Sequence, residues 1–134
     1  MDHPYNKLSS GQDNRLYFKG RVCLLGDNAY AIAPNLGAGA GQAIEDVYVL
    51  ASLFGARPSR TGEHVESVFR AYDAVRRPRS QEVVQLSELC RRTYSYQEGI
   101  RSDHEKMRAE LVERVKWVID EDLEAHLAKA MAML

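Results

Sequence analysis

A glycine-rich segment that directly follows an apolar run most constrains how this chain can fold. Residues 16–25 read as an extended segment, and its second half, 22–25, is apolar throughout. Such a run favours a strand buried on both faces, as in the parallel sheet of an α/β protein. Residues 26–41 then predict a loop, because glycine and proline interrupt regular structure. The interrupting residues are Gly26, Pro34, Gly37, Gly39 and Gly41.

Most of the remaining chain shows helical periodicity. Apolar residues recur at spacings of three and four, which predicts helices over 39–54, 62–76, 79–98 and 103–132. Thr61 is placed to cap the second of these helices. Pro78 is expected to bend or break the chain between the second and the third, because proline lacks the N–H that a helix interior needs.

These elements predict one domain over 1–134, since a chain of this length normally forms a single domain. The expected fold class is α/β-derived and predominantly helical. A single buried strand cannot satisfy its own backbone hydrogen bonds. The chain is therefore expected to be part of a larger α/β fold or a subunit that pairs with a copy. The expected parts are an irregular 1–15, a strand at 16–25, a glycine loop at 26–41 and helices within 39–134.

Composition and charge exclude several classes of protein. Hydrophobic residues make up 45% of the chain and charged residues 28%, which is typical of a globular domain. The formal net charge of −1 gives no basic field for nucleic acid. No apolar run approaches the roughly 18 residues that a membrane-spanning helix needs. The N-terminus lacks the basic start and apolar stretch of a signal peptide, and the two cysteines lack metal-site spacing, so a cytoplasmic location is expected.

The end of the predicted strand carries groups suited to a ligand. Asp27 would lie at the carboxyl end of the strand, where open α/β sheets bind ligands, and could accept hydrogen bonds from a sugar or polyol. The glycines then lead into a helix whose N-terminus offers unpaired N–H groups and a positive dipole end. The spacing differs from the Rossmann fingerprint and from the P-loop. A tight loop that only leads into a packed helix is the alternative.

The motif formed by Gly26-Asp27, Pro34, Gly37 and Gly39 resembles the second flavin-binding motif of FAD-dependent aromatic hydroxylases, the salicylate hydroxylase-like flavoprotein monooxygenases. Segments 2–4, 71–79 and 117–127 resemble other parts of the C-terminal portion of these enzymes. The resemblance implies FAD as the cofactor and a small aromatic or polycyclic organic molecule as the substrate. In the family, an N-terminal dinucleotide-binding fold holds the ADP half of FAD, and the 134 residues contain no such motif.

The resemblance also implies which residues would hold the cofactor. Asp27 would bind the ribityl chain, and the loop with the helix start would lie at the isoalloxazine ring. The polar groups expected to orient a ligand or transfer a proton are Tyr30, Asp27 and Asn28. For Tyr30, a packing residue with a solvated tip is the alternative. The full set of expected cofactor-binding residues is Gly26, Asp27, Pro34, Gly37, Ala38, Gly39 and Ala40.

The chain departs from the family pattern at Asn28, Tyr30 and Asn35, where the family usually has alanine, histidine and histidine. Three hypotheses follow. The chain is a truncated FAD-binding domain that is not an independent hydroxylase, or a repurposed non-redox enzyme such as a cyclase, isomerase or dehydratase that uses the former flavin cleft. The third is a structural protein, either a homodimer or a complementing subunit.

Three further expectations concern charged residues and histidines. Asp46 either contacts the glycine loop or is a surface charge on its helix. The arginines of segment 76–79 are expected at a solvated helix junction rather than in a nucleic-acid-binding patch. The four histidines are scattered along the chain, so no metal site is expected.

Overall fold

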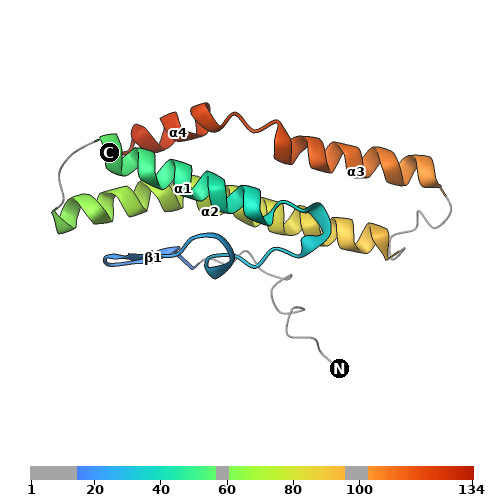
Figure 1. Cartoon of the computed structure of the whole chain (residues 1–134), viewed down its shortest axis with the longest axis horizontal. Helices are drawn as coiled ribbons and strands as arrows, with labels where there is room; N and C mark the ends of the chain where they lie inside the picture. Colours follow the sequence, from blue (N-terminus) through green and yellow to red (C-terminus); the bar gives the residue numbers. More distant parts are fainter. Residues whose placement is uncertain (1–14, 57–60, 96–102) are drawn as a thin grey trace, which may run out of the picture.

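The computed structural model describes residues 15–56, 61–95 and 103–134. In Figure 1, the helices α1 and α2 lie side by side, α3 and α4 follow one side of this pair, and the β hairpin lies on the other. The predominantly helical fold with four helices agrees with the sequence-based expectation. The elements in chain order are β1 (Phe18–Lys19), β2 (Val22–Cys23), the 3-10 turns η2 (Gly26–Asn28) and η3 (Pro34–Leu36), α1 (Gly39–Ala56), α2 (Gly62–Tyr94), α3 (His104–Ile119) and α4 (Leu123–Met131).

The segment expected as one strand over 16–25 forms a two-stranded antiparallel hairpin. Phe18 pairs with Cys23, and Lys19 pairs with Val22. The hairpin packs on α2, where the Tyr72 hydroxyl donates to the Leu24 carbonyl at 3.2 Å. The expected burial on both faces is not found, because Val22 is 66% exposed and no second layer covers this side of the hairpin among the described residues.

Helix α2 runs without interruption through Pro78, so the expected break at this proline is wrong. Proline removes one N–H and crowds the carbonyl four residues earlier. Pro78 is exposed, and the nearby buried Arg76 and Arg79 are held by hydrogen bonds to other elements, which fix the helix on both sides of it. Thr61 caps the helix as expected, its Oγ1 accepting from the His64 N–H at 3.3 Å.

The segment expected as one helix over 103–132 forms two helices. α3 ends at Ile119, and α4 begins at Leu123. The Asp122 carboxylate caps α4 by accepting from the Ala125 N–H at 2.9 Å. Aspartate favours a cap over a helix interior because its side chain bonds the backbone locally. The apolar periodicity continues across this cap and so concealed the break.

The hydrophobic core lies between the hairpin, α1, α2 and α4. Its buried members are Tyr17, Tyr30, Val49, Leu53, Val68, Phe69, Ala71, Tyr72, Val75 and Ala130. Helix α3 is joined to α2 by Arg79, which donates to the Val118 carbonyl at 2.7 Å and lies 4.5 Å above the Trp117 ring centroid. It is also joined by Arg114, which donates to the Thr93 hydroxyl at 2.7 Å. Among the described residues, no helix combines the length and apolar character needed to cross a bilayer.

Candidate functional site

The candidate site is built on the loop between β2 and α1, which begins with the tight turn η2. Gly26 has a φ of +52°, in the left-handed region that favours glycine. A Cβ at this position would lie 3.1 Å from the Ala43 Cβ, so glycine also lets the turn approach α1 closely. The next two residues, Asp27 and Asn28, are exposed. The turn therefore presents a carboxylate and an amide to solvent from a position fixed against α1.

The second half of the loop leads from η3 into α1 with open space beside its backbone. Gly37 adopts a φ of +63°, and a Cβ added at Gly37, Gly39 or Gly41 would meet no atom within 4 Å. The first hydrogen bond of α1 runs from the Gln42 N–H to the Ala38 carbonyl at 3.0 Å. The preceding N–H groups lack intrahelical partners, and no side chain in the described ranges accepts from them. At these glycines a ligand could therefore approach the positive end of the helix dipole closely.

The loop is tied to α2 as well as to α1. The Ser87 hydroxyl donates to the Ala33 carbonyl at 2.5 Å, immediately before η3. Ser87 is fully buried, and Ala33 is partly buried. The middle of the loop is therefore fixed to α2 by a hydrogen bond.

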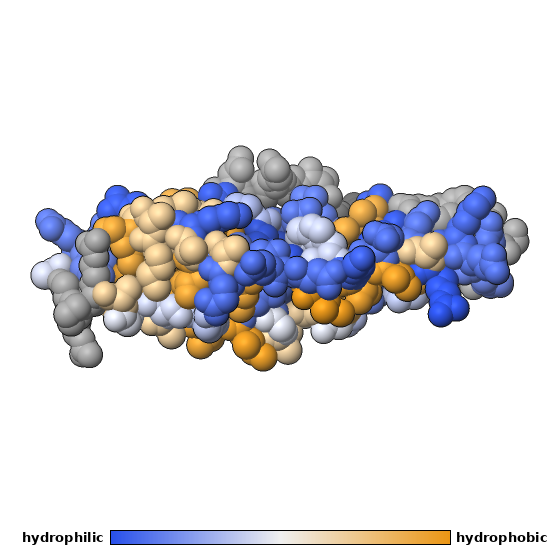
Figure 2. All heavy atoms as spheres, turned by 90° about the horizontal axis from the view of Figure 1, so that it is seen from above, coloured by the Kyte–Doolittle hydropathy of each residue, from blue (hydrophilic) through white to orange (hydrophobic). Residues whose placement is uncertain are grey.

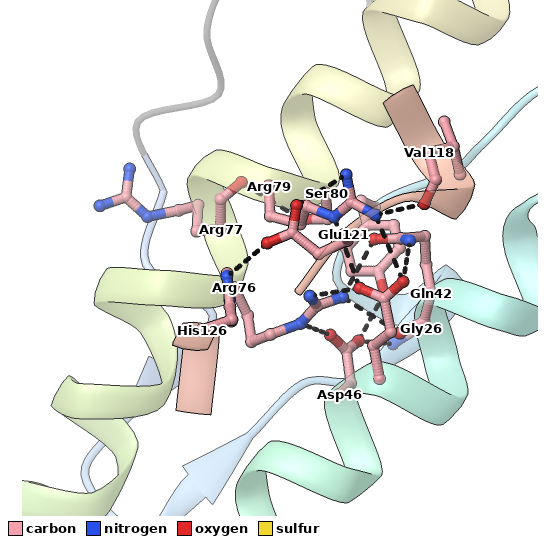
Figure 3. A network of polar contacts seen from close by, with 12 residues as sticks. Gly26, Gln42, Asp46, Arg76, Arg77, Arg79, Ser80, Val118, Glu121 and His126 are labelled. Atoms are coloured by element: carbon pink, nitrogen blue, oxygen red, sulfur yellow. Dashed lines mark hydrogen bonds and ion pairs between the residues drawn. The ribbon is translucent and has the colours of Figure 1, made fainter. Parts of the chain in front are cut away.

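Asp46 on α1 lies behind the first turn and contacts it directly (Figure 3). Its side chain is fully buried. The Oδ2 atom accepts from the Gly26 N–H at 3.0 Å and from the Tyr30 hydroxyl at 2.5 Å, and the Oδ1 atom accepts from Arg76 Nε at 2.7 Å. Of the two alternatives for Asp46, the contact with the glycine loop is the one observed.

Arg76 on α2 is the centre of a polar network that links α1 to α2. It is fully buried, and it also donates to Glu45 Oε2 at 2.6 Å and to Gln42 Oε1 at 3.0 Å. Burial alone would lower the pKa of the guanidinium, but the hydrogen bond and charge of Asp46, with those of Glu45, raise the pKa above its ordinary value. A buried charge needs such pairing, because leaving it unpaired is strongly unfavourable.

The expected solvated junction at 76–79 is therefore wrong for Arg76 and Arg79, which are both buried. Arg79 faces Glu45 at 3.4 Å and Glu121 at 3.5 Å. A signal was present in the sequence, because Arg76 follows Phe69 by seven residues and Tyr72 by four, and so falls on the apolar face of its helix. A charge at such a position points to a buried partner.

Tyr30 lies beneath the loop rather than at its open side. Its ring is buried, 5.7 Å from the ring of Tyr17. Burial, with the hydrogen bond to Asp46, raises the pKa of its hydroxyl far above the ordinary value. This placement favours the packing alternative for Tyr30. The structure brings the other expected residues together in two groups: Gly26, Asp27 and Asn28 in the first turn, and Pro34, Gly37, Ala38, Gly39 and Ala40 in the stretch from η3 to the start of α1.

The described residues contain no group of three or more His, Cys, Asp or Glu side chains placed to hold a metal ion. His126 is buried beside Glu121, with its Nδ1 atom 3.1 Å from Glu121 Oε1. Its Nε2 atom has no hydrogen-bond partner. Burial, followed by the charge of Arg76, lowers the pKa of His126, and Glu121 acts in the opposite direction.

Comparison with known proteins gives a consistent result. Residues 10–87 match the family described as FAD binding domain. A salicylate hydroxylase of Pseudomonas putida is 40% identical over 119 residues, which are 88% of this chain and 27% of that protein. The 6-methylsalicylate 1-monooxygenase of Aspergillus terreus is 38% identical over 109 residues, 81% of this chain and 24% of that protein.

A solved structure described as a salicylate hydroxylase substrate complex matches the fold with a TM-score of 0.77 at 38% identity. The match covers 85% of this chain and 28% of that one. The chain thus spans about a quarter of the length of the relatives it matches.

Proposed function

Because this chain belongs to the FAD-binding domain family of flavoprotein monooxygenases, we propose that its glycine loop forms the flavin-ring side of a FAD site. The observation that supports this most is the open backbone at the start of α1, where Gly37, Gly39 and Gly41 leave space for a flat ligand. The fit extends to η2, where the exposed Asp27 can accept hydrogen bonds from ribityl hydroxyl groups. The residues present therefore suit the cofactor.

This chain contributes contacts that bind the cofactor and an electrostatic environment that favours negative charge on it. When bound, FAD supplies the redox chemistry by which a flavoprotein hydroxylates an aromatic ring. The uncapped N–H groups of 38–41 favour negative charge at the edge of the ring that faces them. Asp27 and Asn28 orient the cofactor from the first turn. Tyr30 acts through Asp46 from behind the loop, because its hydroxyl is already bonded there.

The substrate we propose for the complete site is a small aromatic or polycyclic organic molecule, in line with the salicylate named for the relatives. These 134 residues supply one side of the site and are not an independent hydroxylase. The other side comes from a dinucleotide-binding region, in the same protein or in a complementing subunit. We also propose a cytoplasmic location, as expected from the sequence.

The proposal is tested by titrating flavin with the 134-residue chain and following flavin fluorescence. We expect a dissociation constant in the micromolar range, about −8 kcal/mol. Asp27→Ala should weaken binding about tenfold, because a hydrogen bond to a charged group contributes about 1.5–3 kcal/mol. Asp120→Ala removes an exposed carboxylate at the end of α3 and should leave the affinity unchanged. FMN and riboflavin should bind nearly as well as FAD, since this chain faces the ring and the ribityl chain.

No quenching at hundreds of micromolar protein would contradict the proposal. The non-redox cyclase, isomerase or dehydratase would then be tested by screening small aromatic compounds for binding at the same loop.

A second candidate, association as a homodimer or complementing subunit, is supported by apolar surface. Figure 2 looks onto the side that carries α3 and α4 and shows apolar patches between hydrophilic residues. A shallow groove on α3 is lined mainly by Leu111, Val112, Val115 and Ile119, and Ile119 is 72% exposed. Analytical ultracentrifugation should show a dimer that Ile119→Lys weakens, and a strictly monomeric chain at high micromolar concentration would contradict self-association.

A further inference from the structure

The carboxylate of Asp46 joins the first turn of the loop to the Arg76 network. Its two oxygen atoms face different partners: Oδ2 faces the Gly26 N–H and the Tyr30 hydroxyl, and Oδ1 faces Arg76. Figure 3 shows Asp46 between Gly26 and Arg76. The bond to Gly26 spans twenty residues of sequence, so it is a tertiary contact and not part of the turn itself.

The orientation of this carboxylate is fixed by its surroundings. Asp46 and Arg76 are both fully buried, so neither charge can turn toward water without opening the helix pair. Arg76 is itself held by Glu45 and by the Gln42 side chain and carbonyl. With Oδ1 bound to a guanidinium that cannot move, Oδ2 is aimed at the Gly26 N–H.

The geometry of the first turn makes this single bond important. Gly26 is in the left-handed conformation and lies close to Ala43 of α1. Among the described residues, the other backbone hydrogen bonds of η2 run from the Ala29 and Tyr30 N–H groups to the Gly26 carbonyl, at 2.8 and 3.0 Å. Those bonds close the turn on itself. Among the described contacts, the Gly26 N–H bond to Asp46 is the hydrogen bond by which Gly26 is anchored to α1.

We propose that Asp46 is a positioning residue for the flavin site, which fixes the Gly26–Asn28 turn and so directs the side chains of Asp27 and Asn28 toward the cofactor. Asp46 touches neither cofactor nor substrate in this role and acts through Gly26. The inference rests on the proposed function in one respect, that the turn faces a flavin. The positioning of the turn by Asp46 is a property of the chain alone.

Two isosteric variants separate positioning from general stabilisation. Asp46→Asn replaces one carboxylate oxygen by an NH2 group, which cannot accept. The remaining oxygen is expected to face Arg76, because a guanidinium can only donate, whereas the Tyr30 hydroxyl can accept from the NH2 group. The Gly26 N–H is then the donor that loses its acceptor. Glu45→Gln removes a neighbouring charge from the same guanidinium but leaves both oxygens of Asp46 in place. Both variants weaken the Arg76 network, and only the first changes the bond to Gly26.

Two measurements on the 134-residue chain then show whether Asp46 positions the turn and whether this affects flavin binding. Amide hydrogen exchange of Gly26, followed by NMR, should be at least tenfold faster in Asp46→Asn than in Glu45→Gln after correction for their global stabilities. Titration with FAD should give a dissociation constant at least tenfold higher for Asp46→Asn, equivalent to about 1.4 kcal/mol, and within about threefold of the unmodified chain for Glu45→Gln.

Equal exchange at Gly26 in the two variants, or equal flavin affinity, would overturn the inference. If the unmodified chain binds no flavin, the proposed function fails and the link to the cofactor fails with it. The exchange rate of Gly26 then still decides whether Asp46 holds the turn.

Discussion

Replacement of Arg76 by methionine tests most directly how much the buried polar network contributes to stability. Methionine keeps much of the apolar stem of arginine and removes the guanidinium, so the core remains filled while the ion pairs are lost. The change removes four hydrogen bonds, to Asp46, Glu45 and two atoms of Gln42. It also leaves the Asp46 carboxylate, which is fully buried, without its countercharge.

The unpaired charge determines how much the free energy of unfolding falls in Arg76→Met. Removing one partner of a buried ion pair costs about 3–5 kcal/mol, because the remaining charge stays desolvated. With a urea dependence of about 2 kcal/mol per molar for a domain of this size, the unfolding midpoint should fall by about 1.5–2.5 M. Urea unfolding followed by circular dichroism measures this shift.

Arg92→Met on the same helix is the matched control. Arg92 is partly exposed and forms an i,i+4 salt bridge at 3.3 Å with Glu88, which also pairs with Arg91. Such a pair contributes less than about 1 kcal/mol, so the midpoint should move by at most about 0.5 M. Equal shifts for the two variants would refute the conclusion that Arg76 is a buried structural charge.

Three further predictions follow from the site and from the shifted pKa values. Gly39→Ala should leave the free energy of unfolding unchanged or raise it by about 0.5 kcal/mol, and should weaken flavin binding about tenfold. Gly55→Ala should have a similar effect on stability without changing the flavin affinity. Equal flavin affinities for the two variants would contradict an open backbone at Gly39. Because burial and then Arg76 lower the pKa of His126, the unfolded chain takes up this proton first, and the free energy of unfolding should fall as the pH drops below about 6.5. His126→Gln should flatten that urea-unfolding profile and the exposed His104→Gln should not, and identical profiles would count against the assignment. Burial, with the charges of Asp46 and Asp73, raises the pKa of the Cys23 thiol to about 11. Iodoacetamide should therefore alkylate Cys23 about a hundredfold more slowly at pH 8 in the folded chain than in the urea-unfolded chain. Equal alkylation rates, measured by mass spectrometry, would show an accessible thiol.

The parts of the fold that depend on local chemistry could be predicted from the sequence. The glycine loop, the start of α1 at Gly39 and the cap at Thr61 follow from the conformational preferences of single residues. The continuity of α2 through Pro78 could not be predicted, because the contacts of Arg76 and Arg79 that hold the helix come from other elements. The break between α3 and α4 was signalled by Asp122, and the continuing apolar periodicity outweighed it.

The same distinction holds within the site. The polar residues of the first turn and the glycines of the second were expected as ligand-binding residues, since turn position and residue type alone indicate them. The network behind the loop was expected only in part, at Asp46. Arg76 and its partners Gln42 and Glu45 are more than thirty residues apart in sequence, and only the pairing of α1 with α2 brings them together.

The uninterrupted course of α2 has a consequence for how the chain finds its native alignment. Apolar side chains tolerate sliding, whereas a hydrogen bond is lost when a helix shifts by one turn. The buried polar residues of α2 bond to several different segments, with Asp73 and Ser80 both bonding to Tyr17, so a shift of α2 by a single turn would leave several buried polar groups unsatisfied at once. The polar side of α2 therefore allows only one register between α2 and the segments packed against it. The pairs that form it are Asp73 with the Tyr17 N–H, Arg76 with Asp46, Arg79 with the Val118 carbonyl, Ser80 with the Tyr17 hydroxyl, Ser87 with the Ala33 carbonyl, and Thr93 with Arg114.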